Sequence, residues 1–375
     1  MSILLMILGL ILFVLLVVVH EFGHFIMARR NGVEVEEFGI GFPPRAWSKK
    51  LKSGMLFTLN WLPLGGFVKL KGEHDADTAK GSYGAASLWS KTKIIGAGVA
   101  MNLIVAIIMF TLLAIIGMPK VIENQFTVSS DTKIMRNEVL IANIEDNSPA
   151  SQAGLQPRDQ LTSIGIENGE TVQITEAESL PEATKKFQGQ KVQLSFERDG
   201  KVNKVDVQLR STDEVEASKN SENPKGYLGV VPAEFTLQRS TWSAPIVGVG
   251  ITKQFTELTL KGLGSIVTGL VRGNTKQASE QVSGPVGIFV LIRDGSKLGL
   301  QFILMIVAII SLTLAIMNIL PIPALDGGRL FVSYLFKILN KPLTEEVEDR
   351  IHGTGFALLM LLFVLITVVD IKRFF

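Results

Sequence analysis

The segment ILLMILGLILFVLLVVVHEFGHFIMARR, from Ile3 to Arg30, decides the fold. A helix needs about 20 mostly apolar residues to cross a bilayer, so we expect this segment to span a membrane from about Ile3 to Ala28. A cleaved signal peptide is the alternative, but no Lys or Arg precedes the apolar run and no small-residue cleavage site follows it. We therefore interpret the segment as a retained helix.

Three further stretches are long and apolar enough to span: about Ile94 to Gly117, Gln301 to Leu320, and about Gly353 to Val369. Buried core helices are the alternative, but four such runs are rare in a soluble protein. The composition agrees, since 47% of the 375 residues are hydrophobic and only 19% are charged. A net charge of +2 gives no sign of a nucleic-acid surface.

The short loops predict the orientation, because cytoplasmic loops are rich in Lys and Arg. Residues 29–93 carry eleven such residues, so we expect this loop to be cytoplasmic. The N-terminus and residues 118–300 are then outside, and residues 321–352 return to the cytoplasm. Lys372 and Arg373 fall outside in this plan, against the rule.

The first helix carries His20-Glu21-Phe22-Gly23-His24, an HExxH pattern. Four helical residues advance about 400°, so both imidazoles lie on one face, as two ligands of one tetrahedral zinc require. Glu21 is placed to accept a proton from the attacking water. Helix-end residues reaching the membrane surface are the alternative, but Arg29 and Arg30 mark that surface. Ionisable groups deeper than this are costly and usually functional.

A third ligand is expected because the chain has no cysteine and catalytic zinc takes three protein ligands. Asp326 follows the third apolar stretch in Asn318-Ile-Leu-Pro-Ile-Pro-Ala-Leu-Asp326-Gly-Gly. The first and third helices both run inward, so their C-terminal ends meet at one depth. A helix stop with proline and glycine explains the Pro and Gly residues but not the acid. His74, in a polar loop, and His352, which opens the fourth helix, are the competing ligands.

These motifs together resemble the site-2 protease class of intramembrane metalloproteases, in particular its RseP group. The resemblance rests on HEFGH at 20–24, LPLGGFVKLKGE at 62–73, SGPVGI at 283–288 and NILPIPALDGG at 318–328, and it covers essentially the whole chain. It implies zinc held by His20, His24 and Asp326, with Glu21 as the base. Relatives often carry Gly-Pro-x-x-Asn in the second helix, where this chain reads Gly98-Val-Ala-Met-Asn102 and lacks the proline.

The class also implies regulated intramembrane proteolysis, in which the substrates are membrane proteins that a first protease has already cut, such as anti-sigma factors or signal-peptide remnants. Asn318 is a candidate for binding the substrate backbone or the oxyanion, and we assign Asn102, Gly65 and Gly66 to substrate binding as well. The expected location is the cytoplasmic membrane, with the active site near its cytoplasmic side.

Residues 55–61 and 65–70 of the cytoplasmic loop read as strands. The family implies a membrane-associated β-element here, whose edge can pair with an unwound substrate. An ordinary hairpin that packs on the loop is the alternative.

The segment from Asn147 to Asp159 resembles the SPAxxAGLxxGD signature of PDZ domains, with Arg158 in place of the usual glycine. One PDZ copy is expected outside the membrane. It binds a new chain end by strand addition, or it acts as a steric filter against large outer domains. Both readings stay open, because a fold does not settle function.

The predicted protein is thus a polytopic α-helical membrane protein with about four spans, a cytoplasmic β-loop and one inserted α+β PDZ domain. Its parts are residues 1–118 with the HExxH site, the PDZ domain at 119–215, a linker with an amphipathic helix on the outer membrane surface at 216–300, and residues 301–375 with the LDGG motif. A PDZ-bearing membrane adaptor with a structural metal site is the alternative function. A metal-ion transporter is disfavoured, because helices two to four have few polar residues.

Overall fold

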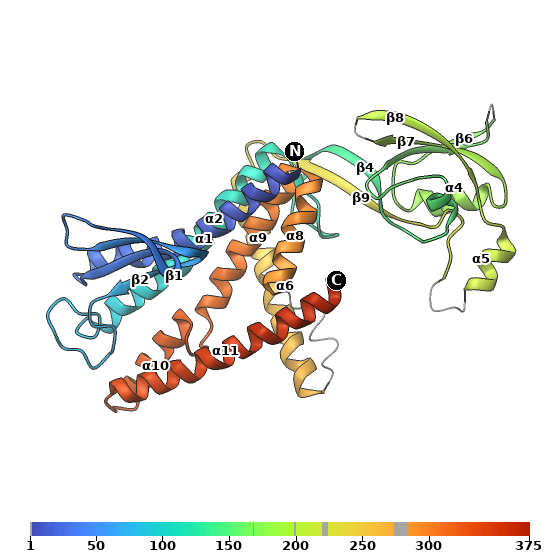
Figure 1. Ribbon diagram of the computed structural model, residues 1–375. Helices are drawn as coiled ribbons and strands as arrows, with labels where there is room; N and C mark the ends of the chain where they lie inside the picture. Colours follow the sequence, from blue (N-terminus) through green and yellow to red (C-terminus); the bar gives the residue numbers. More distant parts are fainter. Residues whose placement is uncertain (1, 168, 199, 220–223, 274–283) are drawn as a thin grey trace. The chain divides into compact units, whose positions relative to one another are not determined.

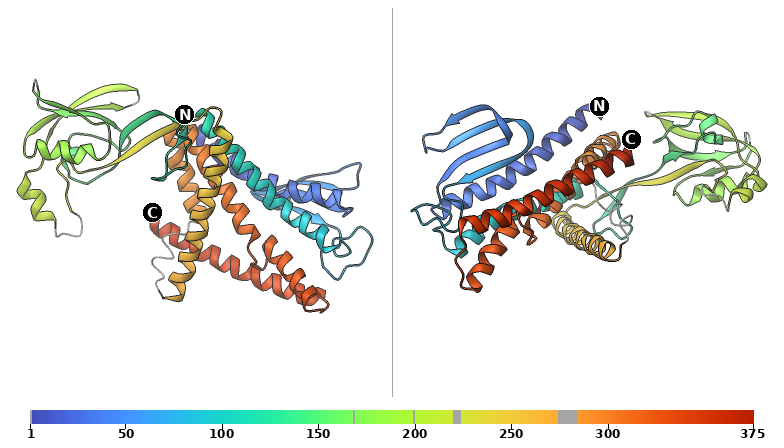
Figure 2. Two further views of the ribbon diagram at one scale, coloured as in Figure 1. Left: turned by 180° about the vertical axis from the view of Figure 1, so that it is seen from behind. Right: turned by 60° about the horizontal axis from the view of Figure 1, so that its bottom comes forward.

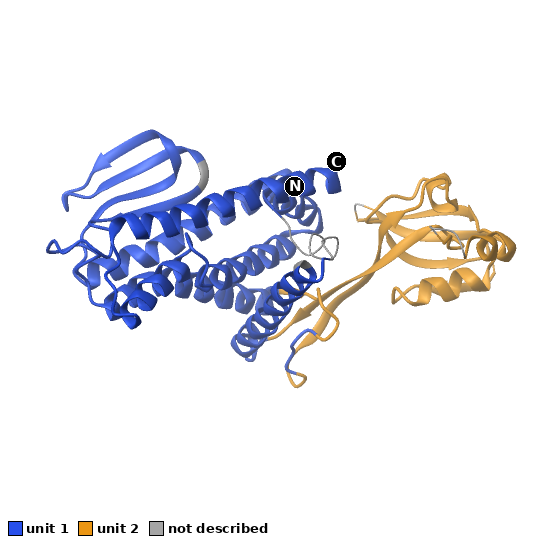
Figure 3. Ribbon diagram, turned by 90° about the horizontal axis from the view of Figure 1, so that it is seen from below, with its two compact units in different colours: residues 1–116, 125–128, 241–375 blue, residues 117–124, 129–240 orange. Residues whose placement is uncertain are grey.

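The computed structural model describes residues 2–167, 169–198, 200–219, 224–273 and 284–375. It divides into two compact units, shown in Figure 3. Unit 1 comprises residues 1–116, 125–128 and 241–375, and unit 2 comprises residues 117–124 and 129–240.

Unit 1 is built on long helices (Figure 1). In the part of the chain that the structure describes, four of them are long and apolar enough to cross a membrane, which confirms the expected number of spans. The corresponding helices are α1 (Ser2–Arg30), α2 (Leu88–Ile116), α9 (Leu300–Ile319) and α11 (Glu345–Phe374). These helices and the sheets described below fit a polytopic membrane protein.

The described residues of unit 1 contain three more helices: α6 (Ala244–Val271), α8 (Pro285–Leu298) and α10 (Asp326–Ile338). The sequence predicted an amphipathic helix on the outer membrane surface. The helix that forms in this stretch of the sequence is α6, and it packs along α2. Phe255 of α6 stacks on Phe110 of α2 with ring centroids 5.7 Å apart. Its position relative to the membrane surface stays a prediction. Ser283, at the start of the SGPVGI motif, lies outside the described residues.

The loop after α1 forms a sheet from two long strands, β1 (Val35–Lys50) and β2 (Leu56–Leu70). Each strand folds back, so residues 37–40 pair with residues 56–59 on one side and 66–69 on the other. Both segments predicted as strands lie in β2, while the sequence did not indicate β1. The sheet packs beside α1, as two views show (Figures 1 and 2).

Unit 2 is a sheet in the order β3-β9-β4-β5-β7-β8, with β6 paired to β5. A buried apolar cluster lies under it, with Ile141, Ile164 and Leu194 fully buried. The strands are β3 (Met118–Pro119), β4 (Lys133–Ile144), β5 (Gln160–Gly165), β6 (Thr171–Gln173), β7 (Lys191–Arg198), β8 (Lys201–Gln208) and β9 (Val230–Arg239). The helices are α3 (Pro149–Gln152), α4 (Ser179–Lys186) and α5 (Thr212–Ser218).

The end of unit 2 differs from the predicted boundary at residue 215. Strand β9 pairs with β4 from Val230 to Arg239, and the unit continues to Ser240. The polar stretch before β9 reads as a linker in the sequence, whereas residues 212–218 of it form α5. The sheet therefore takes a long strand next to β4 from a segment that the sequence assigned to the linker region.

The PDZ-like signature forms a tight corner between β4 and β5. Ser148 caps α3 by accepting a hydrogen bond from the backbone of Ser151, and Pro149 occupies the first turn, as both residue types favour. Asp159 is buried and forms two hydrogen bonds of 2.6 Å with the guanidinium of Arg198. The signature residues thus hold the corner together.

Candidate metal centre

The two histidines of the HExxH pattern lie one turn apart on α1, and both are buried. Gly23 between them lets α1 approach α2: a β-carbon on Gly23 would lie 2.6 Å from the carbonyl oxygen of Ala97. Only glycine fits at that separation, so the HEFGH sequence encodes both the imidazole pair and the close packing behind it.

Helix α2 fixes the outer nitrogens of both imidazoles. Nδ1 of His24 donates a hydrogen bond of 2.8 Å to the carbonyl oxygen of Ile94. The amide of Asn102 lies 3.3 Å from Nδ1 of His20, and Asn102 is fully buried. This contact is made by the amide nitrogen of Asn102 and orients the ring of His20. Because Nδ1 of His24 carries a proton, the Nε2 of a neutral His24 is free to bind a metal.

Asp326 is the first residue of α10, after a break that follows α9. Leu320 is extended, and Ala324 has a φ of 76°, a conformation that residues with a side chain rarely adopt. A β-carbon on Gly327 would lie 2.2 Å from the carbonyl oxygen of Ile319, so the glycine is required for α10 to fold back against the end of α9. The break thus turns Asp326 toward α1.

The three predicted ligands come together. Nε2 of His20 lies 3.1 Å from Nε2 of His24, and Oδ2 of Asp326 lies 2.9 Å from the first and 3.2 Å from the second. Ligand atoms about 2.0 Å from a tetrahedral zinc stand about 3.3 Å apart, close to this triangle. Two imidazole nitrogens and one carboxylate oxygen converge on one point, and this donor set fits zinc.

Asp326 suits the same role by residue type, since a carboxyl group binds a metal in its ionised form.

Beside the triangle is a cavity of about 340 Å³. Glu21 lines it next to His20. Every sequence-predicted site residue except His24 borders the cavity: His20, Glu21, Gly65, Gly66, Asn102, Asn318 and Asp326. The structure therefore brings the predicted site together around one space.

The two glycines of the loop border the same cavity. A β-carbon on Gly66 would lie 3.4 Å from Cγ of Glu21, and Gly65 has a φ of 115°. Asn318 lies with its amide nitrogen 3.5 Å from Nε2 of His20.

The competing histidines lie apart from the triangle. His74 faces Glu345 and Asp349 in an exposed polar group. Nδ1 of His352 accepts a hydrogen bond of 3.1 Å from the backbone of Ala324. Neither belongs to the cluster of His20, His24 and Asp326 among the described residues.

Sequence reasoning missed Gly98 of α2. A β-carbon there would lie 2.5 Å from Nε2 of His24 and 2.7 Å from Cε1 of His20. The signal was available, since Gly98 and Asn102 stand four residues apart and share one face of a helix.

Known proteins resemble this chain over nearly its full length. The sequence model of the family described as Peptidase family M50 matches residues 8–362 of this chain. A Clostridium perfringens protein provisionally named zinc metalloprotease is 31% identical over 364 residues, 97% of each chain. The Bacillus subtilis regulator of sigma-W protease RasP is 27% identical over 447 aligned positions, and the zinc metalloprotease RasP of Geobacillus kaustophilus 26% over 445, each covering 97% of both chains. The chain therefore belongs to Peptidase family M50, the site-2 protease family, and is a membrane zinc metalloprotease.

Proposed function

We propose that this protease hydrolyses peptide bonds in or near transmembrane segments, with zinc held by His20, His24 and Asp326 and with Glu21 as the general base. The triangle of two imidazole nitrogens and one carboxylate oxygen beside a cavity that Glu21 also lines carries the proposal. The HExxH histidines lie on a candidate membrane span, Ile3–Arg30, which favours chemistry at membrane depth.

Each residue has a distinct task in this reaction. Zinc at such a site acidifies water and polarises a carbonyl group. Glu21 accepts the proton of the attacking water and passes it to the leaving amine. Asn318, whose amide borders the same cavity, binds the substrate carbonyl or the developing oxyanion. The amide of Asn102 contacts Nδ1 of His20, so its proposed role is to orient that ligand and not to bind substrate.

The substrate binds to β2 in this proposal. A transmembrane helix has its amides paired and must unwind before cleavage, and an exposed strand edge can pair with the unwound stretch. Residues 66–70 form one of the two outer segments of the small sheet, and Gly66 lies against Glu21. Substrate paired along this edge reaches the cavity beside Gly65 and Gly66.

Unit 2 is proposed to be a PDZ domain on the outer side that selects substrates already shortened by another protease. In the described part of the chain, β9 pairs with β4 on one side, while β3 covers only its end at Leu237 and Gln238 on the other. The uncovered edge, from Val230 to Phe235, is where a peptide end would add as a strand. A steric filter against bulky outer domains needs no such edge.

The proposed place of the enzyme is the cytoplasmic membrane, with the loop of residues 29–93 and the metal site toward the cytoplasm. Anti-sigma factors and signal-peptide remnants are the proposed substrates. The relative from Bacillus subtilis, named as a regulator of sigma-W, supports the first class.

The adaptor with a structural metal site requires a closed set of four ligands. The fourth would be His74 or His352, and both are engaged elsewhere. A set of three protein ligands favours catalysis, because structural zinc sites are four-coordinate.

The substitution Glu21→Gln tests the proposal. We expect the purified variant to bind zinc like the wild type and to cleave a reporter transmembrane substrate at least about 10³-fold more slowly, since the base is lost. Glu257→Gln, at an exposed position of α6, is the matched control and should cleave normally. Full activity of Glu21→Gln would overturn the assignment.

A further inference from the structure

Helix α11 touches the loop that delivers Asp326. Nδ1 of His352 accepts the backbone N–H of Ala324 at 3.1 Å. The second ring nitrogen, Nε2, is buried and has no hydrogen-bond partner among the described residues. The ring therefore makes one polar contact in this part of the structure, and that contact is to a backbone amide two residues before Asp326.

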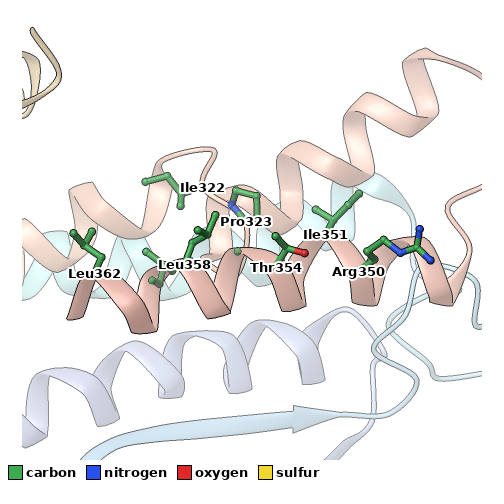
Figure 4. Close-up of a pocket in the computed structure, with 9 residues that line it drawn as sticks. Ile322, Pro323, Arg350, Ile351, Thr354, Leu358 and Leu362 are labelled. Carbon is green, nitrogen blue, oxygen red and sulfur yellow. The ribbon is translucent and has the colours of Figure 1, made fainter. Parts of the chain in front are cut away.

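A second contact lies one turn away on the same face of α11. Gly355 packs directly on Pro323: a β-carbon at Gly355 would lie 2.5 Å from Cβ of Pro323 and 2.6 Å from its carbonyl oxygen. Residues three apart on a helix share a face, so His352 and Gly355 contact the consecutive residues Pro323 and Ala324 together. Figure 4 shows Ile322 and Pro323 on the side of the loop that faces α11, in a groove of about 460 Å³.

The contacted residues control where α10 begins. Ala324 has a positive φ, and such a conformation persists only where the surroundings hold it. One residue, Leu325, separates Ala324 from Asp326, so a change of backbone at Ala324 would turn the carboxylate away from the imidazoles. No other side chain is seen to hydrogen-bond the Ala324 amide among the described residues.

We infer that His352 and Gly355 are positioning residues for the metal centre: together they hold the Pro323–Ala324 backbone so that Asp326 faces His20 and His24. The inference rests on the proposed role of Asp326 as a ligand. His352, which the sequence offered as an alternative metal ligand, thus acts on the site through the backbone and does not bind the ion.

The test replaces His352 in the full-length protein and measures zinc affinity by competition with a chelator in detergent. Leu fills a similar volume without an acceptor, whereas Oδ1 of Asn stands one bond beyond Cγ, as Nδ1 of His does. We expect His352→Leu to weaken zinc binding about tenfold or more, as loss of a supporting contact does. His352→Asn should restore affinity to within about threefold of wild type.

Gly355 provides an independent arm. Gly355→Ala should weaken zinc binding to a similar degree, because its methyl group meets Pro323. Gly353→Ala is the matched control, since a β-carbon there meets no atom within 4 Å. Equal zinc affinity in His352→Leu, Gly355→Ala and the wild type would overturn the inference, and so would an Asn variant as weak as the Leu variant.

Asp326→Asn separates this inference from the proposed function. If that variant loses zinc while His352→Leu and Gly355→Ala keep it, the positioning role is wrong and the ligand assignment stands. If Asp326→Asn keeps full zinc affinity, the ligand assignment itself is wrong.

Discussion

The backbone of Gly98 lies against the imidazole of His24, so that a β-carbon at Gly98 would stand 2.5 Å from Nε2. The second helix therefore forms a wall of the metal site. Helix α2 has no side chain at Gly98, which leaves room for the imidazoles. Its residues Ile94 and Asn102 form hydrogen bonds with His24 and His20.

Gly98→Ala should displace the imidazoles from the triangle. A misplacement of about 1 Å costs on the order of 10²-fold in rate, so we expect kcat/KM to fall by about that factor and zinc to bind more weakly. Gly96→Ala on the same helix is the control, because a β-carbon there meets nothing within 4 Å. Wild-type kinetics in Gly98→Ala would show that α2 does not hold the imidazoles this tightly.

Substitutions of Asn102 and Asn318 should affect different quantities, zinc affinity for the first and kcat for the second. Asn102→Leu removes the partner of Nδ1 of His20 and should weaken zinc binding about 10- to 100-fold, as other losses of such partners do. Asn318→Leu should keep zinc affinity within about threefold and lower kcat about 10²- to 10³-fold, as loss of an oxyanion donor does. Chelator competition and single-turnover cleavage measure the two quantities. The reverse pattern would exchange the two roles.

The sequence was enough to propose the zinc ligands and the general base. It did not reveal the residues that hold these ligands in place. HExxH and LDGG are local patterns whose ligand types alone indicate zinc, and the proline break placed Asp326 at the end of a helix. Gly98 and His352 act through contacts between segments distant in sequence. No local pattern reveals which glycine meets an imidazole, or which histidine meets a backbone amide.

Arg158 stands where the PDZ signature has glycine, and the structure shows why glycine is usual there. Its φ is 78°, which costs a residue with a side chain about 1–2 kcal/mol. Arg158→Gly should therefore stabilise unit 2 by about 0.5–1 kcal/mol, after the extra backbone freedom of glycine is counted. Amide exchange of β5 and β7 in the full-length protein measures this.

Gln156→Gly serves as the control for that substitution. Gln156 is not among the residues with positive φ, so glycine there should destabilise unit 2 by up to about 1 kcal/mol. Destabilisation by Arg158→Gly of the same size would contradict the conformational argument.

The capping box of α5 should make this helix sensitive to acid. The backbone and hydroxyl groups of Ser211 hold the pKa of Glu214 below its ordinary value of 4.5. A carboxyl group whose pKa is lower in the folded than in the unfolded protein stabilises the fold at pH values above its unfolded-state pKa. This stabilisation is lost as the pH falls through the folded-state pKa. Amide exchange in α5 should therefore speed up, relative to its intrinsic rate, below about pH 4.

The same measurement on Glu214→Gln supplies the contrast. This variant should lose most of the acid dependence, because a neutral amide does not titrate. An unchanged dependence would mean that another group in unit 2 controls α5.

Strand β9 shows a different limit of the sequence. Its residues, Val230 to Arg239, alternate poorly, and a strand that closes a sheet with β4 some ninety residues earlier leaves no local mark. Unit 2 extends to Ser240, whereas the PDZ domain predicted from the sequence ends at residue 215. The boundary could be found only from long-range pairing, which a single sequence does not display.

The proposed metal ligands come from distant segments of the chain, since His20 and Asp326 are 306 positions apart in the sequence. With the proposed ligand set, a nascent chain that extends only to the end of α9 carries two of the three zinc ligands. The metal site can therefore be completed only after the segment that follows α9 has been synthesised, and the first span alone would have no hydrolytic centre.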